Sequence, residues 1–103
     1  MGRAKSPTNI EDLLARLRRE MPRLREDHSV RSLGVFGSFV RGEQKRGSDL
    51  DVLIEFERTP GLLGFLELER KLSMLLGVPV DLVQKESLKP AIGRRILEEV
   101  RPV

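Results

Sequence analysis

The spacing of apolar and polar residues changes along the chain, and each type of spacing predicts a helix or a strand. Apolar residues recur at helical spacing between residues 10 and 17, behind a capping box at residues 8–11, so a first helix is predicted to begin at Thr8. Pro22 is expected to interrupt or kink this helix, because proline lacks the backbone N–H and its ring clashes with the preceding turn. His28, the only histidine, follows in a polar stretch and is interpreted as a solvated loop residue.

Three apolar runs predict strands. Residues 30–36 form a run typical of a buried strand. Residues 49–56 alternate, and their apolar members would face the core: Leu50, Val52, Ile54 and Phe56. Residues 80–83 predict a third strand, in which Asp81 is the one charged residue. An aspartate within an apolar strand is unusual unless its side of the strand is polar or functional.

Helices are predicted between and after these strands. Ser38–Arg41 has the character of a first helical turn. A leucine-rich helix is predicted after the turn at residues 59–61; it ends at about Leu76, with Gly77 as its left-handed cap. A last helix is expected to follow Ser87 as its cap and to run through about Val100. This order predicts an α/β (α+β) fold, with a small mixed sheet flanked by helices.

The composition fits one domain. The 103 residues are 39% hydrophobic and 34% charged, which allows a single core, so residues 8–103 are expected to form one domain behind a flexible start at residues 1–7. No apolar stretch is long enough to cross a bilayer, and no signal-peptide pattern opens the chain. The absence of cysteine excludes disulfides, thiolate metal sites and a cysteine nucleophile. These features favour a cytoplasmic protein without a membrane partner.

Charge is unevenly distributed along the chain. Residues 1–31 hold most of the basic excess, whereas residues 32–60 carry four basic and five acidic side chains, a net charge of −1. A slightly acidic segment is suited to a metal ion. With four Phe, no Trp and no Tyr, the chain lacks an aromatic platform for stacking bases, so nucleic acid is not expected as a direct partner.

The segment from residue 37 to residue 51 carries the candidate chemistry. At its start, the Gly37-Ser38 step follows an apolar strand, and glycine lets the backbone N–H groups approach a phosphate closely. The alternative is an ordinary strand-to-helix turn in which Ser38 acts as a cap. Lys45 and Arg46, farther along, are near enough in sequence to help neutralise phosphate charge, or else belong to a solvated loop.

Aspartates supply the candidate metal ligands. Asp49 and Asp51 are two residues apart in a predicted strand, so their carboxylates are expected on one side, where both could reach Mg²⁺. The alternative is an acidic pair that faces solvent at a sheet edge. Asp81 would complete a carboxylate cluster if its strand pairs beside the Asp49 strand; otherwise it could be a hydrogen-bonded edge residue.

The combined pattern Gly37-Ser38-x-x-Arg41-Gly42, then five residues, then Ser48-Asp49-x-Asp51, resembles the signature of the DNA polymerase β-type nucleotidyltransferase superfamily. Within it, the chain is most similar to the minimal nucleotidyltransferases, small prokaryotic proteins often paired with a helical HEPN-domain protein. The order of the predicted elements agrees with this family from residue 8 to residue 100. The resemblance implies the polymerase β-type nucleotidyltransferase fold.

The resemblance also implies roles for the matching positions. Asp49, Asp51 and Asp81 would be catalytic residues and metal ligands, with Asp81 able to accept the proton of the attacking hydroxyl. Nucleotide-binding roles would belong to Gly37 and Ser38, which would hold the β- and γ-phosphates, and to Ser48 and Arg41. For Arg41, phosphate contact and bracing of the loop through a salt bridge are equally open.

The implied activity is Mg²⁺-dependent transfer of AMP from ATP to a hydroxyl of a partner protein, as the antitoxin of a HEPN-type toxin. Two alternatives from other classes remain. One is a binding module that neutralises its partner by contact without turnover. The other is a small-molecule nucleotidyltransferase that works as a dimer, so a homo-oligomer is left open as well.

Overall fold

A four-stranded sheet with helices on both sides organises the chain. The computed structural model describes residues 9–103; the predicted flexible start and the predicted cap Thr8 lie outside the described residues. The elements, in chain order, are α1 Ile10–His28, β1 Val30–Phe36, α2 Ser38–Arg41, β2 Leu50–Phe56, α3 Leu62–Leu76, β3 Val80–Gln84, a 3₁₀ turn at Lys85–Ser87, α4 Pro90–Glu99 and β4 Arg101–Pro102. This architecture confirms the predicted α+β class.

The sheet is mixed and has the strand order β3-β2-β1-β4. β1 pairs antiparallel with β2 and with β4, whereas β2 and β3 run parallel. In this register Asp51 on β2 lies opposite Phe36 on one side and opposite Asp81 on the other. The strand that carries Asp81 therefore pairs beside the Asp-x-Asp strand, as the sequence required for a carboxylate cluster.

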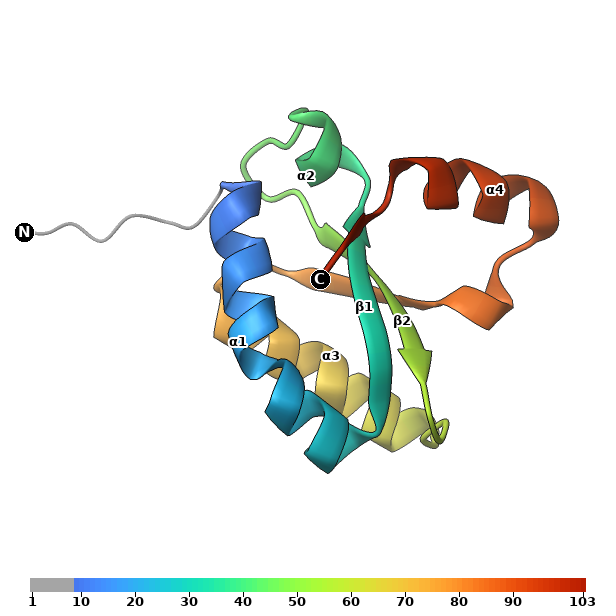
Figure 1. The fold of residues 1–103 in the computed structure, drawn as a ribbon. Helices are drawn as coiled ribbons and strands as arrows, with labels where there is room; N and C mark the ends of the chain where they lie inside the picture. The colour runs from blue at the N-terminus through green and yellow to red at the C-terminus, as the bar shows by residue number, and fades with distance from the viewer. Residues whose placement is uncertain (1–8) are drawn as a thin grey trace, which may run out of the picture.

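The core lies between the sheet and the two long helices. α1 and α3 cover one face of the sheet, and α4 lies beyond the other face (Figure 1). Leu50, Val52 and Ile54 are fully buried, which confirms the face predicted from the alternation in residues 49–56. They pack against leucines of the two helices that are also fully buried, namely Leu13, Leu14, Leu17, Leu24, Leu72 and Leu76. Burying these side chains is the main stabilising term of the fold.

α1 is longer and more continuous than the sequence predicts. Its cap is Asn9, whose Oδ1 accepts a hydrogen bond of 2.7 Å from the Glu11 N–H. The helix runs through Pro22 to His28, so the predicted interruption and the predicted loop at His28 are both wrong. Pro22 is exposed, while Met21 and Leu24 beside it are buried in the core. This burial holds the turns on both sides of the proline in the helix.

The C-terminal region also differs from the prediction. Ser87 was expected to cap the last helix but ends the 3₁₀ turn, and α4 begins three residues later at Pro90. Proline suits the first position of a helix because its missing N–H has no partner there and its φ is already helical. The short strand β4 follows α4 and was not predicted. Because β4 consists of Arg101 and Pro102 alone, it carries no alternation that sequence analysis could detect.

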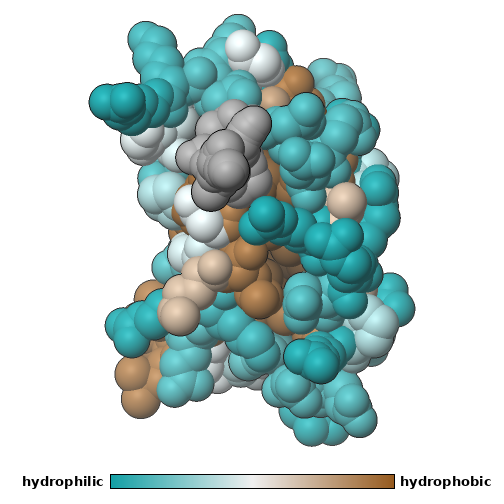
Figure 2. Space-filling view, turned by 90° about the vertical axis from the view of Figure 1, so that its left-hand side faces the viewer, coloured by the Kyte–Doolittle hydropathy of each residue, from teal (hydrophilic) through white to brown (hydrophobic). Residues whose placement is uncertain are grey.

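The face of the molecule shown in Figure 2 is largely hydrophilic. Figure 2 shows the left-hand side of Figure 1, where charged and polar side chains surround a strip of hydrophobic atoms. Exposed large apolar side chains lie on α3, at Leu62, Leu63, Leu66 and Met74, and on α4, at Ile92 and Leu97. Among residues 9–103 there is no helix with the length and apolar character needed to span a membrane.

Candidate active site

Gly37 links β1 to α2 and is the most constrained residue of the site. Its φ is +86°, a conformation that other L-residues rarely adopt, and the residue is buried. A Cβ at this position would collide with Oδ2 of Asp51. Only glycine therefore allows the end of β1 to lie directly against the Asp51 carboxylate, which brings the two ends of the candidate motif together.

The aspartates form an electrostatically strained group. Asp51 is half-buried on β2, Asp81 lies opposite it on β3, and Asp49 precedes β2 in an exposed position. Partial burial, followed by repulsion from Asp81 and from Asp49, raises the pKa of Asp51 to about 6. Negative charge is thus concentrated at this edge of β2 and β3, and a cation bound there would relieve it.

The donor set fits a hard divalent cation, although the ligands are not already arranged around one point. Carboxylate oxygens are the ligands that Mg²⁺ prefers in proteins. Within residues 9–103, no three acidic or histidine side chains stand close enough together to form a ready cation site. The two exposed carboxylates, Asp49 and Asp81, have room to adjust around Asp51.

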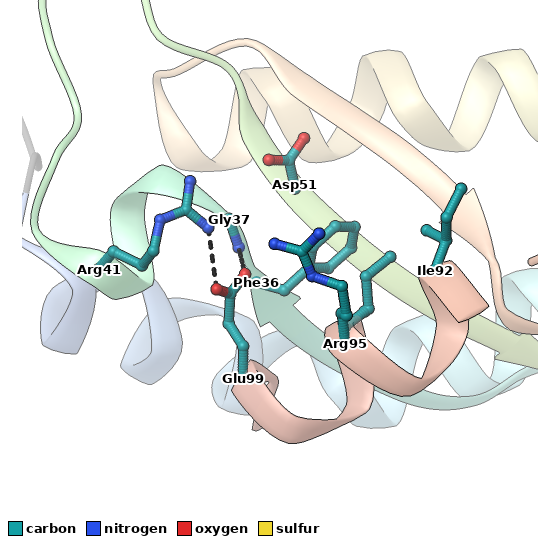
Figure 3. Close-up of a pocket in the computed structure, with 8 residues that line it drawn as sticks. Phe36, Gly37, Arg41, Asp51, Ile92, Arg95 and Glu99 are labelled. Atoms are coloured by element: carbon teal, nitrogen blue, oxygen red, sulfur yellow. Dashed lines mark hydrogen bonds and ion pairs between the residues drawn. The ribbon is translucent and has the colours of Figure 1, made fainter. Parts of the chain in front are cut away.

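A carboxylate from α4 reaches into the Gly37 turn. The Gly37 N–H donates a hydrogen bond of 2.6 Å to Oε2 of Glu99, and Nη1 of Arg41 donates one of 2.8 Å to Oε1 of the same side chain (Figure 3). Partial burial raises the pKa of Glu99, but these two bonds outweigh it and leave the pKa below its usual value. Glu99 is therefore charged at neutral pH.

Arg41 braces the loop in the described structure. Besides Glu99, its guanidinium binds Glu43, through Nε and Oε1 at 3.0 Å. This is the salt-bridge role that the sequence left open beside phosphate contact. The side chain nevertheless remains 47% exposed and lines the same cavity as Gly37 and Asp51, so it is still accessible to a ligand.

These groups surround one open cavity of about 320 Å³, lined by Phe36, Gly37, Arg41, Asp51, Ile92, Arg95, Ile96 and Glu99. In Figure 3 the guanidinium of Arg95 reaches into this cavity on the side of Asp51. Sequence reasoning missed both Arg95 and Glu99. A signal was present, because residues 92, 95, 96 and 99 share one face of a helix, and charged residues on a face otherwise predicted to be apolar indicate a polar site.

The two serines of the motif lie in different surroundings. Ser38 is the first residue of α2, next to Gly37, and its carbonyl accepts a hydrogen bond of 2.9 Å from the Glu43 N–H. The Ser48 hydroxyl accepts one of 2.8 Å from the Lys45 N–H and thereby closes the loop before β2. Ser48, Lys45 and the exposed Arg46 line a separate cavity, beside residues 77–79. The structure thus does not bring Ser48 to the cavity that contains Asp51.

Comparisons with known proteins agree with this geometry. Residues 14–103 match the family model described as a nucleotidyltransferase domain. The protein adenylyltransferase MntA of Thermococcus cleftensis is 53% identical over 91 residues, which cover 88% of this chain and 89% of the relative. A relative from Methanocaldococcus jannaschii, provisionally named a protein adenylyltransferase, is 42% identical over 84% of this chain and 98% of its own length.

Solved structures give the same result. A structure described as a minimal nucleotidyltransferase superposes with a TM-score of 0.75 at 39% identity and covers 92% of this chain and 96% of its own. A toxin–antitoxin structure with AMP-PNP superposes with a TM-score of 0.67 at 26% identity, over 82% of this chain and 69% of that one. With a family model spanning nearly the whole chain and a glycine turn set against paired aspartates, the chain belongs to the nucleotidyltransferase domain family and is a minimal nucleotidyltransferase.

Proposed function

We propose that this protein transfers AMP from ATP to a hydroxyl group of a partner protein, with Mg²⁺ held by Asp49, Asp51 and Asp81. The observation that carries the proposal is the direct pairing of Asp51 and Asp81 across β2 and β3, next to the Gly37 turn. Gly37, Arg41 and Asp51 line one cavity, and Asp81 lies beside Asp51 on the neighbouring strand. The named activity of the 53% identical relative, a protein adenylyltransferase, supports the choice of AMP.

The reaction forms one bond and breaks one. The acceptor oxygen bonds to the α-phosphorus of ATP, the bond to the bridging oxygen breaks, and pyrophosphate leaves. The chemistry that Mg²⁺ supplies when bound is neutralisation of phosphate charge and activation of the acceptor oxygen. The chain itself positions the reactants: the Gly37 N–H and Arg41 would hold phosphate oxygens, and Asp81 would accept the hydroxyl proton.

The proposed partner is a HEPN-type toxin, which would make this protein an antitoxin that acts in the cytoplasm. A toxin–antitoxin structure with AMP-PNP has the same fold at 26% identity, which supports both the partner class and an adenine nucleotide. The cavity of about 320 Å³ is open to solvent. An acceptor presented by a partner protein suits such a surface better than a small molecule that needs an enclosing pocket.

The test uses ATP labelled at the α-phosphate, MgCl₂ and the protein encoded by the adjacent gene. Wild type is expected to label the partner, and Asp51→Asn and Asp81→Asn are expected to reduce labelling by at least 100-fold. Glu98→Gln, an exposed acidic position on α4, is the matched control and should label normally. Normal labelling by Asp51→Asn would reject the proposal, and a tight complex without labelling would favour an antitoxin that acts by contact.

A further inference from the structure

Two oppositely charged side chains lie one turn apart on α4, and both reach the candidate nucleotide cavity. One carboxylate oxygen of Glu99 accepts a hydrogen bond from the Gly37 N–H, and the other accepts one from Arg41. Both donors lie where the phosphates are proposed to bind. The Arg95 side chain enters the same cavity and makes no hydrogen bond or ion pair with any residue between 9 and 103, although its charge helps to lower the pKa of Glu99. The Glu99 carboxylate therefore has two hydrogen-bond partners, whereas the Arg95 guanidinium is available to bind a ligand.

The partners of Glu99 are those that recognise a phosphate. A backbone N–H at a glycine turn and an arginine guanidinium are recurrent donors to phosphate oxygens, and the bonds they make to a carboxylate have the same geometry. The bond to the Gly37 N–H, at 2.6 Å, uses the single proton that this group can donate. A nucleotide phosphate cannot take that donor while Glu99 holds it.

The helix that carries this pair is weakly attached to the rest of the molecule. Gly93, which packs on Leu88, is its only buried residue, whereas five residues of α1 and three of α3 are buried. An element with so few buried contacts opens at low free-energy cost. Moving the Glu99 side chain out of the Gly37 turn therefore disturbs few buried contacts of α4.

We propose, resting on the nucleotidyl-transfer function above, that Glu99 is an internal competitor that occupies the Gly37 N–H and Arg41 until the nucleotide displaces it, and that Arg95 binds the phosphates of the incoming nucleotide. Arg95 suits this role because a guanidinium can bind phosphate through two parallel N–H bonds. Glu99 also lines the cavity that contains Asp51, so its departure removes negative charge from the path of the phosphates.

Calorimetric titration with ATP and with AMP, both in MgCl₂, tests the proposal. Arg95→Gln is expected to weaken ATP binding about tenfold and to leave AMP binding nearly unchanged, because the β- and γ-phosphates are absent from AMP. Glu99→Gln is expected to tighten ATP binding roughly fivefold, since the neutral amide competes less well for both donors. Arg94→Gln and Glu98→Gln are matched controls at exposed neighbouring positions on α4.

Weaker ATP binding by Glu99→Gln would overturn the proposal and make Glu99 a brace that supports the nucleotide site. Equal losses for ATP and AMP in Arg95→Gln, or a loss no greater than in Arg94→Gln, would overturn the role of Arg95. Glu99→Asp keeps the charge but shortens the side chain, so it should reach the two donors less well and should also tighten ATP binding. Thermal unfolding of each variant checks that the variant is folded. If wild type binds no ATP, nucleotidyl transfer itself fails; if wild type binds and the variants match it, this inference alone fails.

Discussion

Asp51 lies directly opposite Asp81 in a parallel strand pair, so the two carboxylates belong to one register position of the sheet. Neighbouring residues of adjacent strands project to the same face, and like charges at such positions repel. Gly37 borders the pair from the end of β1. The arrangement concentrates charge where a metal and a phosphate would meet, and it makes the consequences of several substitutions predictable.

Gly37→Ala is expected to abolish labelling of the partner and to destabilise the protein by about 2–4 kcal/mol, since a positive φ and a collision with Asp51 add together. Urea unfolding measures the second effect. Gly42→Ala is the control for a positive φ in open space: φ is +72° and ψ 24° there, a left-handed conformation that costs alanine about 1 kcal/mol. Equal losses in both variants would show that the Asp51 contact contributes nothing.

The raised pKa of Asp51 predicts a pH-dependent stability in the absence of metal. Because the folded-state pKa of about 6 exceeds the usual aspartate value of 3.8, protonated Asp51 favours the folded state, and this stability is lost as the pH rises through 6. With EDTA present at pH 8, the free energy of unfolding of Asp51→Asn should exceed that of wild type by about 1–2 kcal/mol. This figure allows for solvent screening, because the Asp51 side chain is half-exposed.

The same comparison at pH 4 supplies the control. The difference between Asp51→Asn and wild type should largely disappear there, because Asp51 is protonated in the folded protein and the unfolded chain is close to its own pKa. Urea unfolding at pH 4, 6 and 8 measures the trend. If the difference in unfolding free energy stays constant with pH, its cause is the packing of the asparagine amide and not the charge of Asp51.

Bound Mg²⁺ is expected to offset the repulsion between the carboxylates. Adding MgCl₂ at pH 8 should raise the thermal midpoint of wild type by a few degrees, because an ion that binds only the folded state stabilises it. Asp51→Asn and Asp81→Asn should lose most of this increase, while Glu67→Gln on the exposed side of α3 should keep it. An equal rise in all four proteins would indicate a general salt effect.

The C-terminal strand should be sensitive to the size of the residue at position 34. A Cβ on Gly34 would approach Cγ2 of Val100 to 2.6 Å, so Gly34→Ala is expected to cost about 1–3 kcal/mol by overpacking. Val100→Ala in the same chain should recover most of that loss. A double-mutant cycle of urea unfolding measures the coupling, and additive effects would exclude direct contact.

Local sequence patterns predicted the elements that carry the carboxylates. Alternation in residues 49–56 identified the face of β2 correctly, although the strand begins at Leu50 and leaves Asp49 just outside it. The position of Asp81 could be predicted only conditionally, because strand pairing is a non-local property. Its pairing with Asp51 is now described, while the catalytic and metal-binding roles of the three aspartates stay predictions.

Features that depend on tertiary packing were missed. Pro22 stays helical because buried neighbours on both sides outweigh its local cost, and propensity alone does not contain that information. The contact between Glu99 and Gly37 joins residues 62 positions apart in sequence, and it depends on how α4 docks on the sheet. Neither the docking of a helix nor a two-residue strand leaves a periodic signal in the sequence.

The helices differ in how many of their residues are buried, so the active site spans two regions of different local stability. Asp51 sits on β2, a central strand whose amides should exchange with deuterium only when the whole domain unfolds. Arg95 and Glu99 sit on a helix with a single buried residue, whose amides should exchange through local opening at much lower free energy. Substitutions in α4 can therefore retune nucleotide affinity while leaving the global unfolding free energy almost unchanged.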